Sequence, residues 1–313
     1  MANESTPTGG GATTIEDLHD DVLTRALRHL DGPALAAASC ATSRLRSVST
    51  QPHIWRDICL ATWPSLRHPR LLRILPSFPH SYRSFFFDAH PFPSLHATAA
   101  GRGRLTELIS AVDLYHDGAP IFSRVVETET TSSWFQGAPF RIDALDRKDL
   151  STAALVISPA DLTLSWVIID PAGLRAVNLS SRRPVAVDRQ WYTWDTLVRF
   201  ATVLEVGGSV YSATVVVTCH EATGHVRELG LTVEDIDGIC LNGRNSLGIL
   251  GAALEGERKR ETEGETEMRY EGFAKGKRQR EEWTAMRERM LDLCCTTVGV
   301  SAFLSFLALV AFP

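Results

Sequence analysis

Two histidines and a glutamate stand close together in the segment CHEATGH, residues 219–225. These residue types bind and activate zinc in proteases, where an HExxH helix presents both imidazoles to the metal and the glutamate acts as a general base. Here His220 and His225 are five positions apart, and Gly224 interrupts the helix that would have to turn both onto one face. We therefore predict that they flank a hairpin turn and bind no metal.

The other residues that could catalyse a reaction or bind a metal also predict no active site. The segment EDIDG, residues 234–238, contains a fragment of a calcium loop but lacks the further oxygen ligands. Six cysteines, at positions 40, 59, 219, 240, 294 and 295, form no CxxC pair and no zinc spacing with histidine. Because no secretory signal opens the sequence, we expect reduced thiols in the cytosol and no glycosylation at Asn178. No catalytic residue, metal or cofactor is predicted.

The elements that could position a binding surface begin with four short helices in residues 18–58. Asp20 and Asp21 suit the start of the first helix, and the sequence Asp31-Gly32-Pro33 ends it and opens an alanine-rich second helix. Two further helices carry Leu45 and Val48, and then Ile54, Trp55 and Ile58 on their apolar faces. Such short helices cannot bury all this surface among themselves, so part of it must meet another surface.

Residues 18–58 resemble an F-box, the helical module that docks on the Skp-type adaptor of cullin ubiquitin ligases. The resemblance runs without a gap from the first leucine and the acidic residue to the final apolar–tryptophan pair. The residues that it assigns to adaptor binding are Leu18, Asp21, Val22, Leu23, Leu27, Leu30, Leu35, Leu45, Ile54 and Trp55. His19 replaces the usual proline and Leu45 a frequent tryptophan, which favours weaker adaptor binding. The alternative is a helical cap without a partner.

The next segment sharpens the resemblance. Residues 63–104 contain Trp63-Pro64-Ser65 and the aromatic cluster Tyr82, Phe85, Phe86 and Phe87. They are similar to the extension that follows the F-box in a plant family with a hydrophobic C-terminus. Because aromatic side chains bury much apolar surface, we expect this cluster to join the F-box to the next domain; a ligand-stacking site is the alternative.

Residues 105–254 change to short β-rich runs separated by turn residues, which predicts an antiparallel sandwich or barrel. The expected strands are ALVIS, LTLSWVIID, LRAVNLS, PVAVD, SVYSATVVVTC and VRELGLTV, with one helix at residues 193–204. The pattern distantly resembles the sandwich of plant phloem-type lectins. Candidate anchors for a partner are Trp166, Trp191, Tyr192 and Trp194, although we expect most of them in the core.

The last sixty residues predict a charged linker that becomes a helix near Glu281, followed by an apolar helix at 291–313. Residues 293–313 carry no charge and would span roughly 30 Å as a helix, the thickness of a bilayer core. A C-terminal membrane anchor is favoured, with basic residues on the cytosolic side and Cys294 and Cys295 open to acylation. A buried core helix is the alternative. The KGKRQR run fits a nuclear signal, a nucleic-acid patch or a solvated face.

Together these patterns predict an α+β protein: a disordered start at 1–14, an F-box at 15–62, an aromatic connector at 63–104, a β-rich domain at 105–254, a charged linker and helix at 255–290, and the apolar helix. The resemblance implies a non-catalytic adaptor that binds a Skp-type protein and, through it, cullin and RING subunits. It would hold an unidentified substrate at the cytoplasmic face of a membrane, or in the nucleus if the tail does not insert. A net charge of −5 argues against nucleic acid as a partner. A lectin-like module without a ligase role is the alternative.

Overall fold

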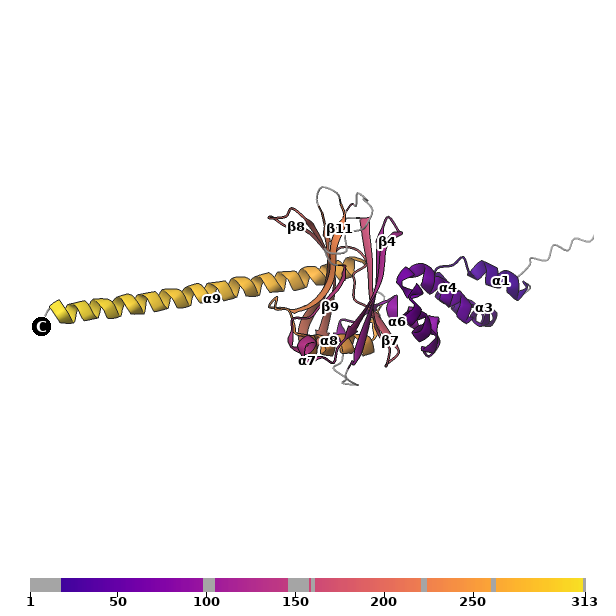
Figure 1. Ribbon diagram of the computed structural model, residues 1–313, viewed down its shortest axis with the longest axis horizontal. Helices are drawn as coiled ribbons and strands as arrows, with labels where there is room; N and C mark the ends of the chain where they lie inside the picture. Colours follow the sequence, from indigo (N-terminus) through magenta and orange to yellow (C-terminus); the bar gives the residue numbers. More distant parts are fainter. Residues whose placement is uncertain are drawn as a thin grey trace, which may run out of the picture.

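The computed structural model describes residues 18–97, 105–145, 158, 161–220, 224–259 and 263–311. In these residues short helices come first, two largely antiparallel sheets follow, and one long helix comes last, which confirms the α+β class. The N-terminal helices lie at one end of the molecule and the last helix, α9 (Glu263–Ala311), extends from the other (Figure 1). The predicted disorder at 1–14 falls outside the described residues.

Four helices open the described chain, as predicted: α1 (Asp20–Leu27), α2 (Gly32–Ala41), α3 (Ser43–Ser49) and α4 (Pro52–Thr62). Side-chain caps separate them, because Asp31 accepts a hydrogen bond from the Ala34 amide at 2.8 Å and Thr42 one from the Leu45 amide at 3.1 Å. Asp20 and Asp21 stand at the start of α1, as predicted, but neither is its cap. His19 is the cap residue of α1, and both aspartates occupy the first turn, where they complement the helix dipole.

The connector folds into two 3₁₀ turns, η2 (Pro64–Arg67) and η3 (Leu75–Ser77), and two helices, α5 (Pro69–Ile74) and α6 (Tyr82–Ala89). Helix α6 buries Phe85 and Phe86, whose rings lie 5.4 Å from Trp63 and 5.2 Å from Trp55, centroid to centroid. Gly32 at the start of α2 is required here, because a Cβ at this position would lie 2.0 Å from the Phe86 ring. The connector and the first four helices therefore share one core.

Two sheets pack face to face. The four-stranded sheet has the order β4 (Ala119–Glu129), β3 (Glu107–His116), β6 (Leu162–Asp170), β7 (Arg175–Asn178). The six-stranded sheet has the order β2 (His96–Ala97), β9 (Thr196–Val206), β10 (Ser209–Cys219), β11 (Val226–Asp235), β5 (Arg141–Leu145), with β8 (Ala186–Arg189) also on β9. A short pair, β1 (Phe92–Pro93) and β12 (Arg258–Lys259), is not hydrogen-bonded into the ladder of either sheet. The expected sandwich is present.

Alternation along β3 and β6 explains how the layers are held together. Leu108, Val112 and Trp166 point into the core between the sheets, where they meet Phe200 and Val215 of the six-stranded sheet. The intervening residues of the same two strands lie in the core of the N-terminal helices: Ile109, Ala111, Val167 and Ile169. The central strands β3 and β6 are thus buried on both faces, which confirms that the aromatic cluster of α6 forms the joint to the sandwich.

Several expected elements differ in the structure. The helix expected at 193–204 is wrong, because this segment is β9, paired with both β8 and β10. Helices α7 (Ser133–Gly137) and α8 (Gly243–Glu255) and strands β3, β4 and β5 were not predicted. The run ALVIS lies outside the described residues except for Ser158. Helix α9 begins at Glu263 rather than near Glu281, since its first turns pack on the six-stranded sheet through the buried Phe273.

Candidate binding surfaces

The residues expected to bind an adaptor divide into two groups by burial. Six of them are core residues of the chain itself: Leu23, Leu27, Leu35, Leu45, Ile54 and Trp55. Leu18 and Leu30 are half-buried, Asp21 is exposed, and Val22 is 52% exposed. The buried group holds the helices in shape, so any direct contact with an adaptor falls to the exposed part of α1 and its neighbours. Their role in adaptor binding stays a prediction.

Helix α1 is fastened to α3 by one arginine. Arg44 donates from Nε to Asp20 Oδ1 at 3.1 Å and from Nη2 to the same carboxylate at 3.0 Å, and it also donates to the Leu18 carbonyl. The carboxylate of Asp20 is largely exposed, so water screens this pair. Helices α1 and α2 also leave small apolar side chains exposed: Val22, Ala26, Ala37 and Ala41.

Polar contacts lock the connector onto the four-stranded sheet. Trp63 Nε1 donates to Ser165 Oγ at 2.8 Å, and the Ser65 amide and hydroxyl donate to the two carboxylate oxygens of Asp113 at 2.8 and 2.5 Å. Asp113 is completely buried, and this burial raises its pKa above the ordinary value for an aspartate while the bonds from Ser65 oppose the rise. Directional bonds thus fix the angle between helices and sheet.

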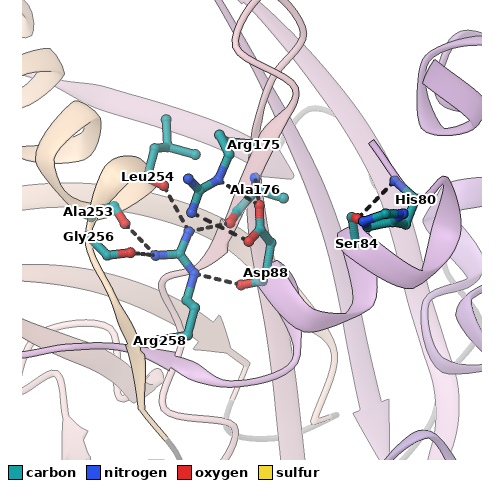
Figure 2. Close-up of polar contacts among 9 residues, drawn as sticks. All are labelled: His80, Ser84, Asp88, Arg175, Ala176, Ala253, Leu254, Gly256 and Arg258. Atoms are coloured by element: carbon teal, nitrogen blue, oxygen red, sulfur yellow. Dashed lines mark hydrogen bonds and ion pairs between the residues drawn. The ribbon is translucent and has the colours of Figure 1, made fainter. Parts of the chain in front are cut away.

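A half-buried guanidinium ties three elements together at the same joint (Figure 2). Arg258 donates to the carbonyls of Asp88 at 2.9 Å in α6, Ala176 at 2.7 Å in β7, and Ala253 and Leu254 at 2.9 Å each at the end of α8. Asp88 also pairs with Arg175 at 2.9 Å. Burial lowers the pKa of Arg258 to about 10, against the opposite pull of Asp88, so the group stays charged at neutral pH. The charge neutralises the carbonyl end of α8.

The outer face of the six-stranded sheet is only partly covered by α9 and holds a cleft of about 330 Å³. Side chains from four strands and the β8–β9 loop line it, among them Arg141, Tyr192, Arg199 and Glu228. The loop itself carries Trp191, Tyr192 and Trp194, which are 82%, 60% and 57% exposed. The expectation that most of the four candidate anchors lie in the core is therefore wrong: only Trp166 does.

This aromatic loop has a defined shape. Gln190 and Asp195 close it through a backbone hydrogen bond of 2.9 Å, and Trp194 adopts a left-handed backbone at φ 60°. Asp195 is fully buried beneath the loop and accepts two bonds from Arg227 Nη1 at 3.3 Å. The exposed rings are thus held on a fixed support, as in binding loops of other folds.

Three curated proteins of Arabidopsis thaliana are similar to this chain along most of its length. A probable F-box protein is 41% identical over 334 aligned positions, which cover 100% of this chain and 98% of that protein. Two further F-box proteins are 37% and 36% identical, covering 93% and 83% of this chain and 94% and 79% of their own lengths. This chain belongs to a family of plant F-box proteins. No family model matches it, and no solved structure does.

The similarity of this F-box protein to its relatives extends well beyond the first sixty residues. One alignment covers the whole chain, including the sandwich and α9, so the similarity is not confined to the N-terminal helices. The resemblance of residues 18–58 and of the aromatic extension to a plant F-box family is confirmed at the family level. The sequence predicts the aromatic residues of the loop as candidate anchors but not their exposure or the neighbouring cleft, because both depend on the strand pairing around residues 190–195.

The two segments of the F-box protein that resemble metal-binding motifs, residues 219–225 and 234–238, lie at turns. His220 and His225 flank the β10–β11 hairpin, with the His220 amide 2.8 Å from the His225 carbonyl, as predicted. In EDIDG, Asp235 Oδ1 accepts from the amides of Asp237 at 3.0 Å and Ile239 at 2.9 Å, so this carboxylate oxygen is bound within an Asx turn.

One group of potential metal ligands went unnoticed in the sequence. Ligand atoms of His116, Asp117 and Asp161 lie within 4.8 Å of one another beside the β3–β4 turn. His116 Nε2 accepts a hydrogen bond from the Ser158 amide at 3.3 Å, which leaves the proton on Nδ1, the nitrogen that faces Asp117 at 3.7 Å. A protonated Nδ1 cannot ligate a metal, and both carboxylates are exposed. The arrangement fits a neutral imidazole held within a turn.

The two buried cysteines and Asn178 behave as small structural residues. All six cysteines are free; Cys59 and Cys219 are buried, and burial raises the pKa of the Cys219 thiol to about 11. Asn178 is 2% exposed and accepts hydrogen bonds from the amides of Trp166 at 3.2 Å and Ser180 at 3.1 Å. Its side chain is therefore closed to modification in the folded protein.

Proposed function

We propose that this F-box protein is the substrate-recruiting subunit of a Skp–cullin–F-box ubiquitin ligase. Helices α1–α4 bind a Skp-type adaptor, which connects the chain to cullin and RING subunits, and the sandwich holds a protein substrate. The mechanism is proximity: a substrate lysine held near the conjugating enzyme reacts at a raised effective concentration. No side chain of this chain takes part in the chemistry, and the chain is an adaptor rather than an enzyme.

The proposal follows from the similarity of the chain to F-box proteins. It is supported by the hydrogen bonds that fix the N-terminal helices to the sandwich. Proximity requires that the substrate and the conjugating enzyme keep a fixed separation. The bonds of Trp63, Ser65 and Arg258 satisfy this requirement, because a rotation about the joint would leave buried polar groups without partners.

Co-expression of the full chain with Skp-type adaptors of its own organism tests the adaptor role. Val22→Asp places a charge on an exposed position of α1, so the fold survives, and we expect the adaptor to be lost from the purified complex. Thr24→Asp is the matched control, since Thr24 has the same branched shape on another side of α1. Retention by the control and loss by Val22→Asp support the proposal.

Substitutions at Leu23 and Leu27 are less informative. Both side chains are buried, at 4% and 5% exposure, so aspartate there removes binding by unfolding the helices. A wild-type chain that never copurifies with an adaptor contradicts the ligase role and favours the lectin-like alternative.

For the substrate, we propose the outer face of the six-stranded sheet beside the aromatic loop. Exposed tryptophan and tyrosine side chains on a rigid loop are the residue types that dominate protein interfaces. The neighbouring cleft supplies charged and hydroxyl groups for orientation: Arg141, Arg199, Thr218 and Glu228. The same combination of aromatic and polar groups suits a glycan, so the lectin-like alternative uses this surface too.

For the location, we propose that the end of α9 anchors the protein in a membrane, with the F-box on the cytosolic side. Helix α9 is long and apolar enough to cross a bilayer by length and composition. Every side chain described between residues 281 and 306 is exposed, so the chain itself offers this apolar segment no core. Cys294 and Cys295 stand at the boundary, where acylation would add to the attachment.

A further inference from the structure

Helix α9 leaves a regular row of apolar side chains exposed beyond the sandwich. Trp283, Met286, Met290 and Leu293 are 67%, 63%, 63% and 65% exposed. They follow one another at alternating intervals of three and four residues, and the same intervals continue through Thr297, Val300 and Leu304. This is the a and d spacing of a heptad repeat, the pattern by which helices pair. We call these seven residues the seam.

The seam lies on a different side of α9 from the side that meets its own chain. The contacts of α9 with the sandwich end with the pairs Lys277–Glu234 at 2.8 Å and Arg280–Asp237 at 2.9 Å. The hollow just beyond them is lined from α9 by Arg280, Glu281, Thr284, Ala285 and Glu288, none of which belongs to the seam. The seam is therefore open to a partner at a level where the sandwich no longer covers the helix.

Membrane insertion alone does not cover this row. The charge-free segment begins at Leu293, and Arg287, Arg289 and Asp292 hold the preceding turns in water. Trp283, Met286 and Met290 thus remain on the aqueous side of any bilayer that takes up the tail. Three large apolar side chains on one stripe of a solvated helix indicate a protein contact.

We propose that the seam pairs with the seam of a second copy of this chain, in parallel and in register. With Trp283 and Met290 at a positions, Glu282 falls at g and Arg287 at e. In a parallel pair, g of one helix faces e of the next heptad of the other, so Glu282 meets Arg287 of the partner subunit twice by symmetry. An antiparallel pair would place the two apolar tails at opposite ends, where one membrane could not hold both.

Length supports the same arrangement. Residues 281–293 supply about two heptads, which is marginal for helix pairing in water. The seam continues into the apolar segment, where left-handed helix pairs use the same spacing. A parallel dimer carries two adaptor-binding modules and two substrate surfaces, and this inference goes beyond the ligase role because it requires neither adaptor nor substrate.

Cysteine cross-linking of the full-length protein in its cellular membranes tests the pairing. The exposed cysteines 40, 240, 294 and 295 are replaced by serine, which leaves only the buried Cys59 and Cys219. In this background Met290→Cys lies on the seam and Glu288→Cys lies off it, both on the same exposed turn. With diamide as oxidant, we expect a disulfide-linked dimer of Met290→Cys at about tenfold the yield of Glu288→Cys, because thiols at an a position face each other.

A charge exchange gives the second measurement. In the same Met290→Cys background, Arg287→Glu places like charges opposite each other and should lower the dimer yield several-fold, whereas adding Glu282→Arg should restore it. Equal yields at positions 288 and 290, or no restoration by the double exchange, overturn the proposal. Yields are measured in the membrane and soluble fractions and alongside adaptor copurification, so failure of the anchor or of the ligase role is seen separately from failure of the pairing.

Discussion

At the scale of single residues, the joint between the N-terminal helices and the sandwich depends on side chains that hydrogen-bond to backbone atoms. Arg258 is an example: in the sequence it is one of many charges in residues 255–261, and nothing in that run distinguishes it. In the structure its neighbours are mostly carbonyl oxygens of three elements, far apart in sequence. Sequence patterns recover residues that repeat along one element, such as the apolar stripe of α1, but not a side chain whose partners are main-chain atoms elsewhere.

Replacing Arg258 by lysine should lower the free energy of unfolding by about 2–4 kcal/mol. A lysine has three donors on a flexible stem, so several buried carbonyls at the joint lose a charged hydrogen-bond partner. Chemical denaturation of the full chain measures the change. Arg280→Lys is the control, since Arg280 is 57% exposed at its pair with Asp237 and should change stability by less than about 0.5 kcal/mol. Equal effects of the two variants would contradict the assignment of Arg258 to the joint.

At the scale of elements, the sequence predicts hydrophobic periodicity and side-chain burial better than it predicts which strands pair. The four N-terminal helices and strands β6, β10 and β11 follow their hydrophobic patterns. Strand β9 does not: Leu197, Phe200, Ala201 and Leu204 recur at helical intervals, which is why a helix was expected at 193–204. In the sheet, Val198, Phe200 and Leu204 face the core while Leu197 and Arg199 line the outer cleft, because β8 and β10 supply the hydrogen bonds. Tertiary pairing overrode the local pattern.

Strand pairing also decides the fate of the aromatic loop. The sequence analysis expects most of the four candidate anchors in the core, yet the turn between β8 and β9 carries Trp191 outward. A single sequence gives the composition of such a loop but not its support, which comes from Asp195 and Arg227 in different elements.

The aromatic loop yields a prediction of binding without a change in stability. Trp191→Ala should leave the unfolding free energy within about 0.5 kcal/mol of the wild type, because the side chain is 82% exposed. If the loop holds the substrate, loss of this ring costs about 2 kcal/mol or more, roughly thirtyfold in affinity. Proximity labelling by the full-length protein in cells tests this loss of binding. We expect substrate proteins that the wild type labels to be absent from the set labelled by Trp191→Ala, whereas the adaptor is labelled by both.

Trp134 provides the matched control for this experiment. It is 79% exposed but sits on α7, outside the cleft, so Trp134→Ala should leave the labelling pattern unchanged. Loss of the same proteins in both variants would speak against a substrate site at the loop. Binding of the isolated wild-type protein to glycans, abolished by Trp191→Ala, would favour the lectin-like alternative.

At the scale of the whole molecule, the layers form an ordered series. Helix α6 and the 3₁₀ turn η2 pack on one face of the four-stranded sheet with α1–α4 beyond them, the six-stranded sheet covers the other face, and α9 departs from the far side (Figure 1). The proposed adaptor site and the apolar tail therefore lie at opposite ends. Between the last sandwich contact at Arg280 and Leu293, the helix rises by about 18–20 Å at 1.5 Å per residue. An anchored protein would hold its sandwich near the membrane and its F-box away from it.

If the end of α9 anchors this protein in a membrane, changes in α9 alone should release it. Phe303 and Phe306 are 61% and 62% exposed near the middle of the charge-free segment. Replacing both by arginine costs about 2.5–3.5 kcal/mol for each charge at the centre of a bilayer, so the full-length protein should move to the soluble fraction. Truncation after Met290 should do the same and leave the unfolding free energy of the sandwich unchanged, because the removed residues described here make no buried contact. Resistance of the wild type to alkaline carbonate, with extraction of both variants, is the expected result. Extraction of the wild type, together with a less stable truncation variant, would instead make the tail part of the fold.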